Sequence, residues 1–364
     1  MKAILSTLAT CAFLTTAAAQ AGEFSVAFIN PGGSTDFWGE VAGTMRAAAN
    51  DLDIDLEVID TSRDRFAMAK AAQDIASRTG KPDVVVIVNE LQQGPELLAT
   101  LDKAGIKTFF LLNKLTDEQE AKAGKARQGV PNLIGSLIPD NEIAGYEMGR
   151  SLIVAARKAG KDKDGISILA LIGDTATPAA LQREAGLKRA VKEDPAAKIV
   201  RAIPVHWNRD TAKDRASAFL ARETADAIWA ANDPIAFGAM EAAREKGLKP
   251  GVDISFAGLN WSADALKAVK AGEMTLTHGG HFFGGAWSMV LLYDYMKGAD
   301  FASGGGADVQ FPMSAVTGEN VDAFLAKLGA GDWERIDFAS FSKAKAGVAN
   351  YTFSADAILA AAGD

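Results

Sequence analysis

Two adjacent aromatic residues, Phe37 and Trp38, follow the glycine-containing stretch NPGGST at 30–35, where a helix is expected to begin. Aromatic faces can cover the apolar C–H surface of a small molecule, and a glycine loop lets the backbone approach it closely. Phe37 also lies on the apolar stripe of its helix and could equally be a core residue. Trp38 lies about 100° from that stripe, so we interpret it as a ligand-contacting residue.

Other bulky or polar side chains occupy the same kind of position, directly after an apolar run that predicts a strand. They are Asn113 and Lys114 after 107–112, Arg183 on the helix after 166–172, Trp207 after 198–205, Asn232 after 226–231 and Asn260 after 253–258. Planar amides and a guanidinium group form hydrogen bonds in fixed directions, which suits ligand hydroxyl groups. Asn232 could instead serve only as a helix cap, and Trp207 could cover a core.

Arg183 is the most informative of these residues. Ala180 and Leu187 mark the inward face of the helix predicted at 177–193, and Arg183 shares that face. A buried arginine needs a hydrogen-bonding partner, because burying it unpaired is very costly. Asp174 could be a structural partner, but a polar ligand is the interpretation that we prefer.

Catalytic and metal-binding motifs are scarce in the sequence. The chain has three histidines, His206, His278 and His281, and neither a Gly-x-Ser-x-Gly elbow nor a phosphate loop ending in Gly-Lys-Ser/Thr. His278 and His281 could suggest a metal pair, but no carboxylate cluster accompanies them. We therefore expect a binding protein with no catalytic residue, metal or cofactor, rather than an enzyme.

The N-terminus and the charge balance indicate an exported protein. Residues 1–21 combine a basic start, an apolar run and small residues, which is the layout of a cleaved secretory signal peptide. Cys11 is the only cysteine, and its surroundings resemble a lipobox only loosely. The net charge of −8 opposes nonspecific binding to nucleic acid. We expect a soluble monomer located in the periplasm.

Apolar runs alternate with helical stretches along the chain. Strands are expected at 24–29, 54–60, 83–88, 107–112 and 132–138, and again at 166–172, 198–205, 226–231 and 253–258. Helices are expected near 36–52, 64–79, 93–104, 140–159, 177–193, 210–222, 233–246, 262–271 and 281–298. This alternation predicts an α/β protein with two doubly wound parallel-sheet domains.

The domains are expected to be joined by a three-segment hinge, with crossings near 138–140, 279–281 and 311–316. The expected parts are an N-terminal lobe of 22–138 plus 281–311, a C-terminal lobe of 139–280 plus 312–330, and a C-terminal tail of 331–364. Ligands bind at the carboxyl ends of the strands in such sheets. The aromatic and polar residues would therefore line one cleft if the two lobes face each other.

Five segments carry a resemblance to a known family, and each is weak alone. They are TDFWGEV, TPAALQREAGLKRAV, HWNRD, ANDPIAFGAMEAAREKGL and FAGLNWSADAL, in this order along the chain. With them, residues 23–318 resemble the type I periplasmic substrate-binding proteins of ABC transporters, particularly the ribose and galactose group. The resemblance implies two lobes that close on a sugar without chemistry.

The resemblance also implies roles for individual residues. Phe37, Trp38 and Trp207 would clamp a sugar ring, while Asn113, Lys114, Arg183, Asn232 and Asn260 would read its hydroxyls, with His281 beside Gly280 at the last crossing. The family usually has aspartates in place of Asn113 and Asn260. Having fewer carboxylates beside Lys114 and Arg183 predicts a more positive site, for a polyol or a carbohydrate-derived ligand that includes sugar acids and phosphates.

Two kinds of membrane partner fit the resemblance. The closed protein would deliver its ligand to an ABC transporter permease. Alternatively, it would present itself to a sensor kinase or chemoreceptor with no role in transport. Fold and pocket would be the same in both cases, so the sequence leaves this choice open.

Overall fold

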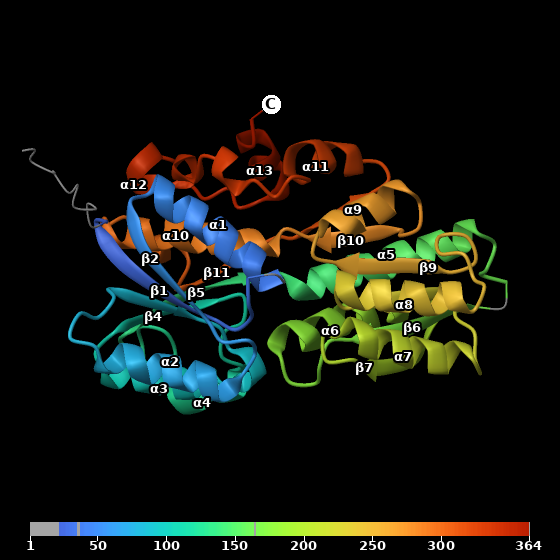
Figure 1. Cartoon of the computed structure of the whole chain (residues 1–364), viewed down its shortest axis with the longest axis horizontal. Coiled ribbons are helices and arrows are strands. Elements are labelled where there is room, and N and C mark those ends of the chain that lie inside the picture. Colours follow the sequence, from blue (N-terminus) through green and yellow to red (C-terminus); the bar gives the residue numbers. More distant parts are fainter. Residues whose placement is uncertain (1–21, 35–36, 164, 364) are drawn as a thin grey trace, which may run out of the picture.

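The structure, a computed structural model, describes residues 22–34, 37–163 and 165–363. The expected signal peptide, 1–21, lies outside the described residues. Within the described ranges, no helix is both long and apolar enough to cross a membrane. The chain forms two lobes side by side, each built on a six-stranded sheet with helices on both faces (Figure 1). The predicted fold class is therefore confirmed.

Six parallel strands form the sheet of the first lobe, in the order β11-β5-β4-β3-β1-β2. They are β1 (Phe24–Asn30), β2 (Ile54–Asp60), β3 (Val84–Ile87), β4 (Lys107–Leu111), β5 (Leu133–Pro139) and β11 (Asp308–Phe311). The helices of this lobe are α1 (Phe37–Asp51), α2 (Arg65–Ser77), α3 (Gly94–Lys103), α4 (Asp117–Ala123) and α10 (Gly284–Met296), with the short helices η1 (Glu90–Gln92), η2 (His281–Phe283) and η3 (Phe301–Gly304).

The short strand β3 shows why this sheet must be covered on both sides. Its sequence VVVI is buried at every position. Val84 and Val86 join the core beneath α1, whereas Val85 and Ile87 join a separate core beneath α2 and α3. A continuous apolar run, rather than an alternating one, is what a parallel strand between two helical layers requires.

The second lobe repeats this design, with strand order β12-β10-β9-β8-β6-β7. Its strands are β6 (Ile166–Ile172), β7 (Ala197–Pro204), β8 (Ala227–Ala230), β9 (Ser255–Leu259), β10 (Leu276–Gly279) and β12 (Ser314–Thr317), and β12 is antiparallel to β10. Its helices are α5 (Asn141–Lys158), α6 (Pro178–Lys192), α7 (Arg209–Leu220), α8 (Asp233–Glu245) and α9 (Ala263–Lys270).

The chain passes between the lobes from β5 to α5, from β10 to η2 and from β11 to β12. These passages coincide with the three expected hinge segments. The sequence did not predict the three short strands at these passages, β10, β11 and β12, nor the helix α4 between β4 and β5. The three missed strands have four residues each, too few for a periodic pattern to stand out.

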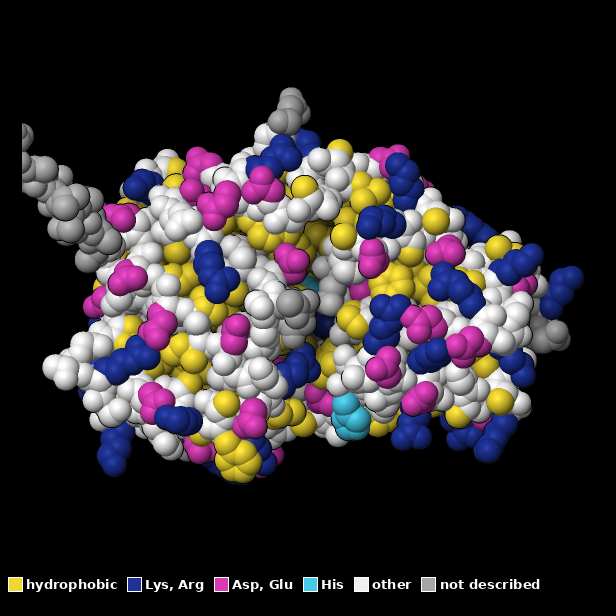
Figure 2. Space-filling view, in the orientation of Figure 1, with side chains coloured by type: hydrophobic (Ala, Val, Ile, Leu, Met, Phe, Trp, Pro, Cys, Tyr) yellow, Lys and Arg dark blue, Asp and Glu magenta, His cyan; other side chains and the backbone are white. Residues whose placement is uncertain are grey.

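After β12 the chain continues as α11 (Val321–Leu328), η4 (Trp333–Arg335), η5 (Phe338–Phe341), α12 (Lys343–Ala346) and α13 (Ala355–Ala361). This C-terminal segment runs along one side of the molecule and lies over both lobes, shown in red in Figure 1. On the face in Figure 2, basic and acidic side chains are interspersed over both lobes. That face therefore offers no broad basic patch to a polyanion.

Candidate functional site

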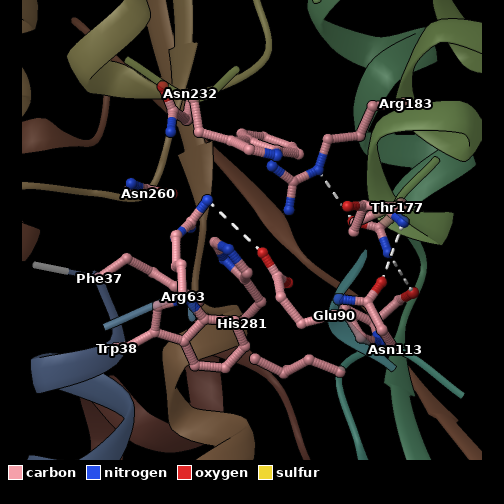
Figure 3. A pocket seen from close by; sticks show the side chains of 15 residues that line it. Phe37, Trp38, Arg63, Glu90, Asn113, Thr177, Arg183, Asn232, Asn260 and His281 are labelled. Atoms are coloured by element: carbon pink, nitrogen blue, oxygen red, sulfur yellow. Dashed lines mark hydrogen bonds and ion pairs between the residues drawn. The ribbon is translucent and has the colours of Figure 1, made fainter. Parts of the chain in front are cut away.

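A cavity of about 490 Å³, including adjoining space open to solvent, lies between the two lobes. This volume falls in the range of about 300–1,000 Å³ that is typical of small-ligand pockets. The lining residues, shown in Figure 3, are Phe37, Trp38, Arg63, Glu90, Leu112, Asn113, Pro139, Asn141, Thr177, Ala179, Arg183, Trp207, Asn232, Asn260 and His281. Eight of the nine residues predicted to bind ligand are among them; Lys114 is not.

Phe37 and Trp38 form the first turn of α1 and line the cavity from the first lobe. Their ring centroids lie 5.3 Å apart in an edge arrangement, and Phe37 stacks on the ring of His281 at 4.3 Å. A Cβ atom built on Gly32 would lie 2.3 Å from Cδ1 of Trp38. The glycine therefore makes room for the indole, a role that the sequence analysis did not predict.

Trp207 is held in the same way in the second lobe. A Cβ atom on Gly173, in the loop after β6, would lie 2.3 Å from Cζ2 of this indole. The Nε1 atom of Trp207 donates a 2.6 Å hydrogen bond to Asp174, and the guanidinium carbon of Arg183 lies 5.7 Å from the Trp207 ring centroid. Each lobe thus presents one tryptophan that is seated on a glycine.

Arg183 is buried, as its place on the inward face of α6 predicted; its exposed fraction is 4%. Nε donates to Oδ1 of Asn141 at 2.9 Å, and Nη1 donates to the carbonyl oxygen of Ala231 at 2.9 Å. Burial lowers the pKa of Arg183 to about 9, opposed by the charge of Asp233. The guanidinium group therefore stays protonated at neutral pH, with its end directed toward the cavity (Figure 3).

Close contact between α5 and α6 places Asn141 beside Arg183. A Cβ atom on Gly186 would lie 2.0 Å from the carbonyl oxygen of Glu142, and one on Gly145 would lie 2.0 Å from the carbonyl oxygen of Arg183. Only glycine permits this separation of the two helix backbones. The sequence thereby brings the first turn of α5 against the arginine.

Asp174 is not the partner of Arg183, although the sequence made it a structural alternative. It accepts hydrogen bonds from the backbone N and Oγ1 of Thr177 as well as from Trp207. Burial acts to raise the pKa of Asp174, but these hydrogen bonds hold it below the usual value. Its carboxylate thus organises the loop before α6 and fixes the Trp207 indole.

Asp233 supplies the negative charge behind the pocket. It is fully buried and accepts hydrogen bonds from Ser262 and from Oγ1 of Thr277. Burial raises the pKa of Asp233 to about 6, against the lowering effect of these hydrogen bonds and of Arg183. At pH 7 the charge of Arg183 is therefore balanced in large part by the Asp233 carboxylate.

The three predicted asparagines all line the cavity, and the side chains of Asn113 and Asn232 form hydrogen bonds with different partners. Oδ1 of Asn113 accepts a 3.0 Å hydrogen bond from the backbone N of Ala179 in the other lobe. Oδ1 of Asn232 accepts from the backbone N of Ile235 and caps α8. The helix-cap interpretation of Asn232 is therefore correct, and the residue also lines the cavity. Asn260 follows β9 and lines the cavity as well.

Lys114 lies outside this cavity, unlike its neighbour Asn113. Its Nζ atom pairs with Glu120 at 2.9 Å and with Asp308 at 2.6 Å. Lys114 instead lines a separate hollow with Asp308 and Gln310. Its two carboxylate partners explain this position, and the positive charge that the sequence analysis assigned to the pocket through Lys114 is not there.

Arg63 and Glu90 line the cavity and were missed by the sequence analysis. Arg63 follows β2, Glu90 follows β3, and their Nη1 and Oε1 atoms lie 3.5 Å apart. Glu90 is only 2% exposed. Both residues follow a predicted strand, so the rule that found the asparagines could have found them. Their opposite charges further balance the pocket.

His281 contributes a neutral ring to the wall of the pocket that contains Phe37. It is buried, and burial together with the charge of Arg183 holds its pKa well below the usual value. Its Nδ1 atom is buried without a hydrogen-bond partner among the described residues. Within the described ranges, no group of three or more His, Cys, Asp or Glu side chains could hold a metal ion.

Backbone strain concentrates around the cavity. Among the described residues, those other than glycine with positive φ include Ser62 and Arg63 after β2, Leu91 and Gln92 in η1, Leu112 after β4, His206 and Trp207 after β7, and Trp261 after β9. Such conformations cost about 1–3 kcal/mol each and cluster at functional sites. The loops at the carboxyl ends of both sheets are therefore shaped at the expense of local stability.

Among the described residues, two hydrogen bonds join the lobes beside the cavity. One is the bond between Asn113 and Ala179, and the other runs from Nε2 of Gln92 to the carbonyl oxygen of Ala176 at 3.2 Å. Both link a loop of the first lobe to the region where α6 begins. The structure therefore represents a closed arrangement of the lobes.

This fold and site define a two-lobed binding protein, and comparison with known proteins agrees. The family model described as "Periplasmic binding protein domain" matches residues 26–300. The chain belongs to this family, in its type I sugar-binding group. A solved periplasmic sugar-binding protein from Pseudomonas fluorescens is 35% identical, with 92% of this chain and 99% of that chain covered and a TM-score of 0.81.

Relatives with a named ligand are more distant. The galactofuranose-binding protein YtfQ of Escherichia coli (strain K12) is 23% identical over 70% of this chain and 76% of its own length. A xylitol-binding protein of Mycolicibacterium smegmatis is 28% identical over 54% of this chain and 53% of its own length. These relatives are solute-binding proteins and not enzymes, as the sequence predicted for this chain.

Proposed function

We propose that this protein captures a small, neutral sugar or polyol between its lobes and delivers it to the permease of an ABC transporter. The observation that carries the proposal is the convergence of Trp38, Trp207 and Arg183, from two lobes, on one cavity. Aromatic faces suit the C–H surface of a sugar ring, and the amide and guanidinium groups suit its hydroxyls.

The charges around the cavity favour a neutral ligand over an acid or a phosphate. Lys114 lies outside, Arg63 pairs with Glu90, and Asp233 lies behind Arg183. This revises the more positive site that the sequence predicted. The names of the relatives agree with this choice, because galactofuranose and xylitol are both uncharged.

Binding would proceed without chemistry, through closure of the lobes. We infer that 22–138 plus 281–311 move as one body and 139–280 plus 312–330 as the other. Ligand in the cavity contacts both bodies and therefore favours the closed form over the open one. Export through a cleaved signal peptide at 1–21 would place this cycle in the periplasm. A sensor partner in place of a permease would use the same cycle.

Calorimetry on the purified chain from residue 22 onward tests the ligand class. The panel pairs neutral sugars and polyols, including arabinose, allose, xylitol and myo-inositol, with aldonates, uronates and sugar phosphates. We expect at least one neutral compound to bind at micromolar concentration or tighter, about −8 kcal/mol. Binding of the charged compounds alone would overturn the neutral-ligand proposal. Mass spectrometry of co-purified small molecules extends the test beyond the panel.

The transport role needs a separate measurement. The protein, loaded with the ligand that calorimetry identifies, is added to proteoliposomes that contain the cognate permease. We expect stimulation of the ATPase activity of the permease and uptake of the ligand. Stimulation of a sensor kinase, with no uptake by any permease, would instead establish the alternative role.

A further inference from the structure

The C-terminal segment makes a fourth passage between the two lobes, in addition to the three hinge segments. Helix α11 packs against α9 of the second lobe, whereas η4 packs against α1 of the first lobe. The passage itself is Gly329-Ala330-Gly331-Asp332, between these two elements. It lies beyond residue 300, the last residue that the family model matches.

The end of the passage in the second lobe is well anchored. The Phe324 ring of α11 lies 4.7 Å from the ring of Trp261, the residue after the site residue Asn260. Asp322 pairs with Lys270 of α9 at 2.8 Å. Trp261 in turn donates from Nε1 to the carbonyl oxygen of Ser314 in β12. Helix α11 therefore belongs mechanically to the second lobe.

Trp333 anchors the other end of the passage in the first lobe. Its Nε1 atom donates a 3.0 Å hydrogen bond to Glu40, one turn beyond Phe37 on α1. Its ring centroid lies 5.2 Å from that of Phe282 and 5.3 Å from that of Phe283, which directly follow the site residue His281. The tail thus rests on the hinge segment that carries a wall of the pocket.

The segment after Trp333 is fixed to the first lobe by a buried carboxylate, Asp294 of α10. It accepts hydrogen bonds from the Ser342 hydroxyl, the backbone N atoms of Lys343 and Ala344, and the Tyr351 hydroxyl. The backbone N of Phe338 also donates to Asp51 of α1. Hydrogen bonds to a charged acceptor are strong, so this attachment persists when the lobes move.

Helix α13 adds a second, noncovalent link back to α11. The Lys327 Nζ atom of α11 donates to the carbonyl oxygen of Leu359 at 3.0 Å, and Ile358 of α13 is fully buried. The C-terminal segment therefore begins on the second lobe with α11, is attached to the first lobe through Asp294, and contacts α11 again through α13. If the lobes separate on this side, the covalent passage must extend and the contact between α13 and α11 must break.

We propose that the segment 321–363 is a strap that limits the opening of the lobes and thereby strengthens ligand binding. Five Cα–Cα steps from Leu328 to Trp333 span at most about 17 Å when extended. The passage now contains a hydrogen bond from Gly331 N to Leu328 O, so it has slack for a limited opening only. Restricting widely open states leaves a larger fraction of molecules near the closed form, which raises apparent affinity.

The test loosens both links and measures opening directly. Eight Gly/Ser residues are inserted between Gly329 and Ala330, alone and together with a chain end after Phe353 that removes α13. The chain from residue 22 onward has no cysteine, so spin labels attach only at Gln73→Cys on α2 and Asp214→Cys on α7. Pulsed electron paramagnetic resonance then gives the distance distribution between the lobes without ligand.

We expect the doubly altered chain to show a broader distribution shifted to longer distances, and the insertion alone to show a smaller shift. The ligand Kd should rise about three- to tenfold. The matched control, built with and without the same chain end, carries the same eight residues between Ala349 and Asn350. That loop begins and ends on Asp294 through Lys343 and Tyr351, so this insertion should leave distances and Kd at the values of its parent chain.

Unchanged distances in the doubly altered chain would overturn the strap, and so would equal broadening in the control chain. The strap deepens the proposed function only in its effect on affinity. If no sugar or polyol binds the unaltered chain, the proposed function fails while the distance measurement still decides the strap. If ligand binds equally well to all chains but the lobes open wider, the effect on affinity is refuted.

Discussion

The side chain of Asn113, in the first lobe, caps a helix of the second lobe by accepting a hydrogen bond from the backbone N of Ala179 at 3.0 Å. Thr177, the N-cap residue of α6, makes no side-chain cap bond of its own; its hydroxyl instead donates to Asp174. The N-terminus of α6 is therefore capped across the cleft, and this cap exists only while the lobes are closed.

Replacing Asn113 with Ala should shift the ligand-free protein toward open forms. The change removes one hydrogen bond between the lobes, worth about 1 kcal/mol, and should weaken ligand binding about fivefold. Asn113→Asp should keep the bond and place a negative charge at a helix N-terminus, which is favourable. Small-angle scattering without ligand should show a larger radius of gyration for the Ala variant only; equal radii for all three proteins would contradict the cap.

Arg183→Ala should abolish most of the affinity without unfolding the protein. Hydrogen bonds from a charged group are worth about 1.5–3 kcal/mol, so loss of about 2–3 kcal/mol corresponds to a 30- to 150-fold rise in Kd. Calorimetry with the identified ligand measures this change, and circular dichroism confirms folding.

Lys114→Ala is the matched control for Arg183→Ala. Both residues were predicted as cationic ligand contacts, but Lys114 pairs with Glu120 and Asp308 outside the cavity. We expect Kd to change by less than about twofold, since the ion pairs are partly exposed and contribute little. A large loss of affinity in Lys114→Ala, or a wild-type Kd in Arg183→Ala, would refute the site as assigned.

The contrast between Asn113 and Lys114 shows how far sequence can predict this site. The rule that ligands bind after parallel strands located both residues in the right loop. The rule could not decide which of the two neighbours faces the cavity. Lys114 points away from it because it pairs with Asp308 on β11, a residue far from it in the sequence. β11 was itself missed, since four residues carry no readable periodicity. The attachment of the C-terminal segment could not be predicted from sequence for a similar reason, because Asp294 binds residues about 50 positions later in the chain.

Gly32→Ala should weaken ligand binding by displacing an aromatic wall of the pocket. The new Cβ atom would lie 2.3 Å from Trp38 Cδ1, so the indole must move. Gly33→Ala is the control, because a Cβ there has no atom of the described residues within 4 Å, its two chain neighbours aside. We expect a shifted tryptophan emission spectrum and at least about tenfold weaker binding for Gly32→Ala, and wild-type behaviour for Gly33→Ala. If the two variants behave alike, Gly32 does not seat Trp38 for binding.

Asp233 should make the folded state less stable as pH rises from 4 to 7. Burial raises its pKa from the ordinary value of 3.8 to about 6 in the folded protein. The folded state therefore holds the proton more tightly than the unfolded chain. The stabilisation is fully present below about pH 4 and is lost as pH rises through 6.

The amide of Asp233→Asn cannot titrate, so the unfolding free energy of this variant should not show the decrease between pH 4 and pH 7 that Asp233 causes in the wild type. The shift of about two pKa units corresponds to about 3 kcal/mol. Urea unfolding of both proteins at pH 4, 5, 6 and 7 gives the difference in unfolding free energy, variant minus wild type. This difference should increase by up to about 3 kcal/mol from pH 4 to pH 7, whatever hydrogen bonds the amide loses. A difference that is constant with pH would show that the Asp233 carboxyl titrates alike in the folded and unfolded chains, and that burial does not raise its pKa.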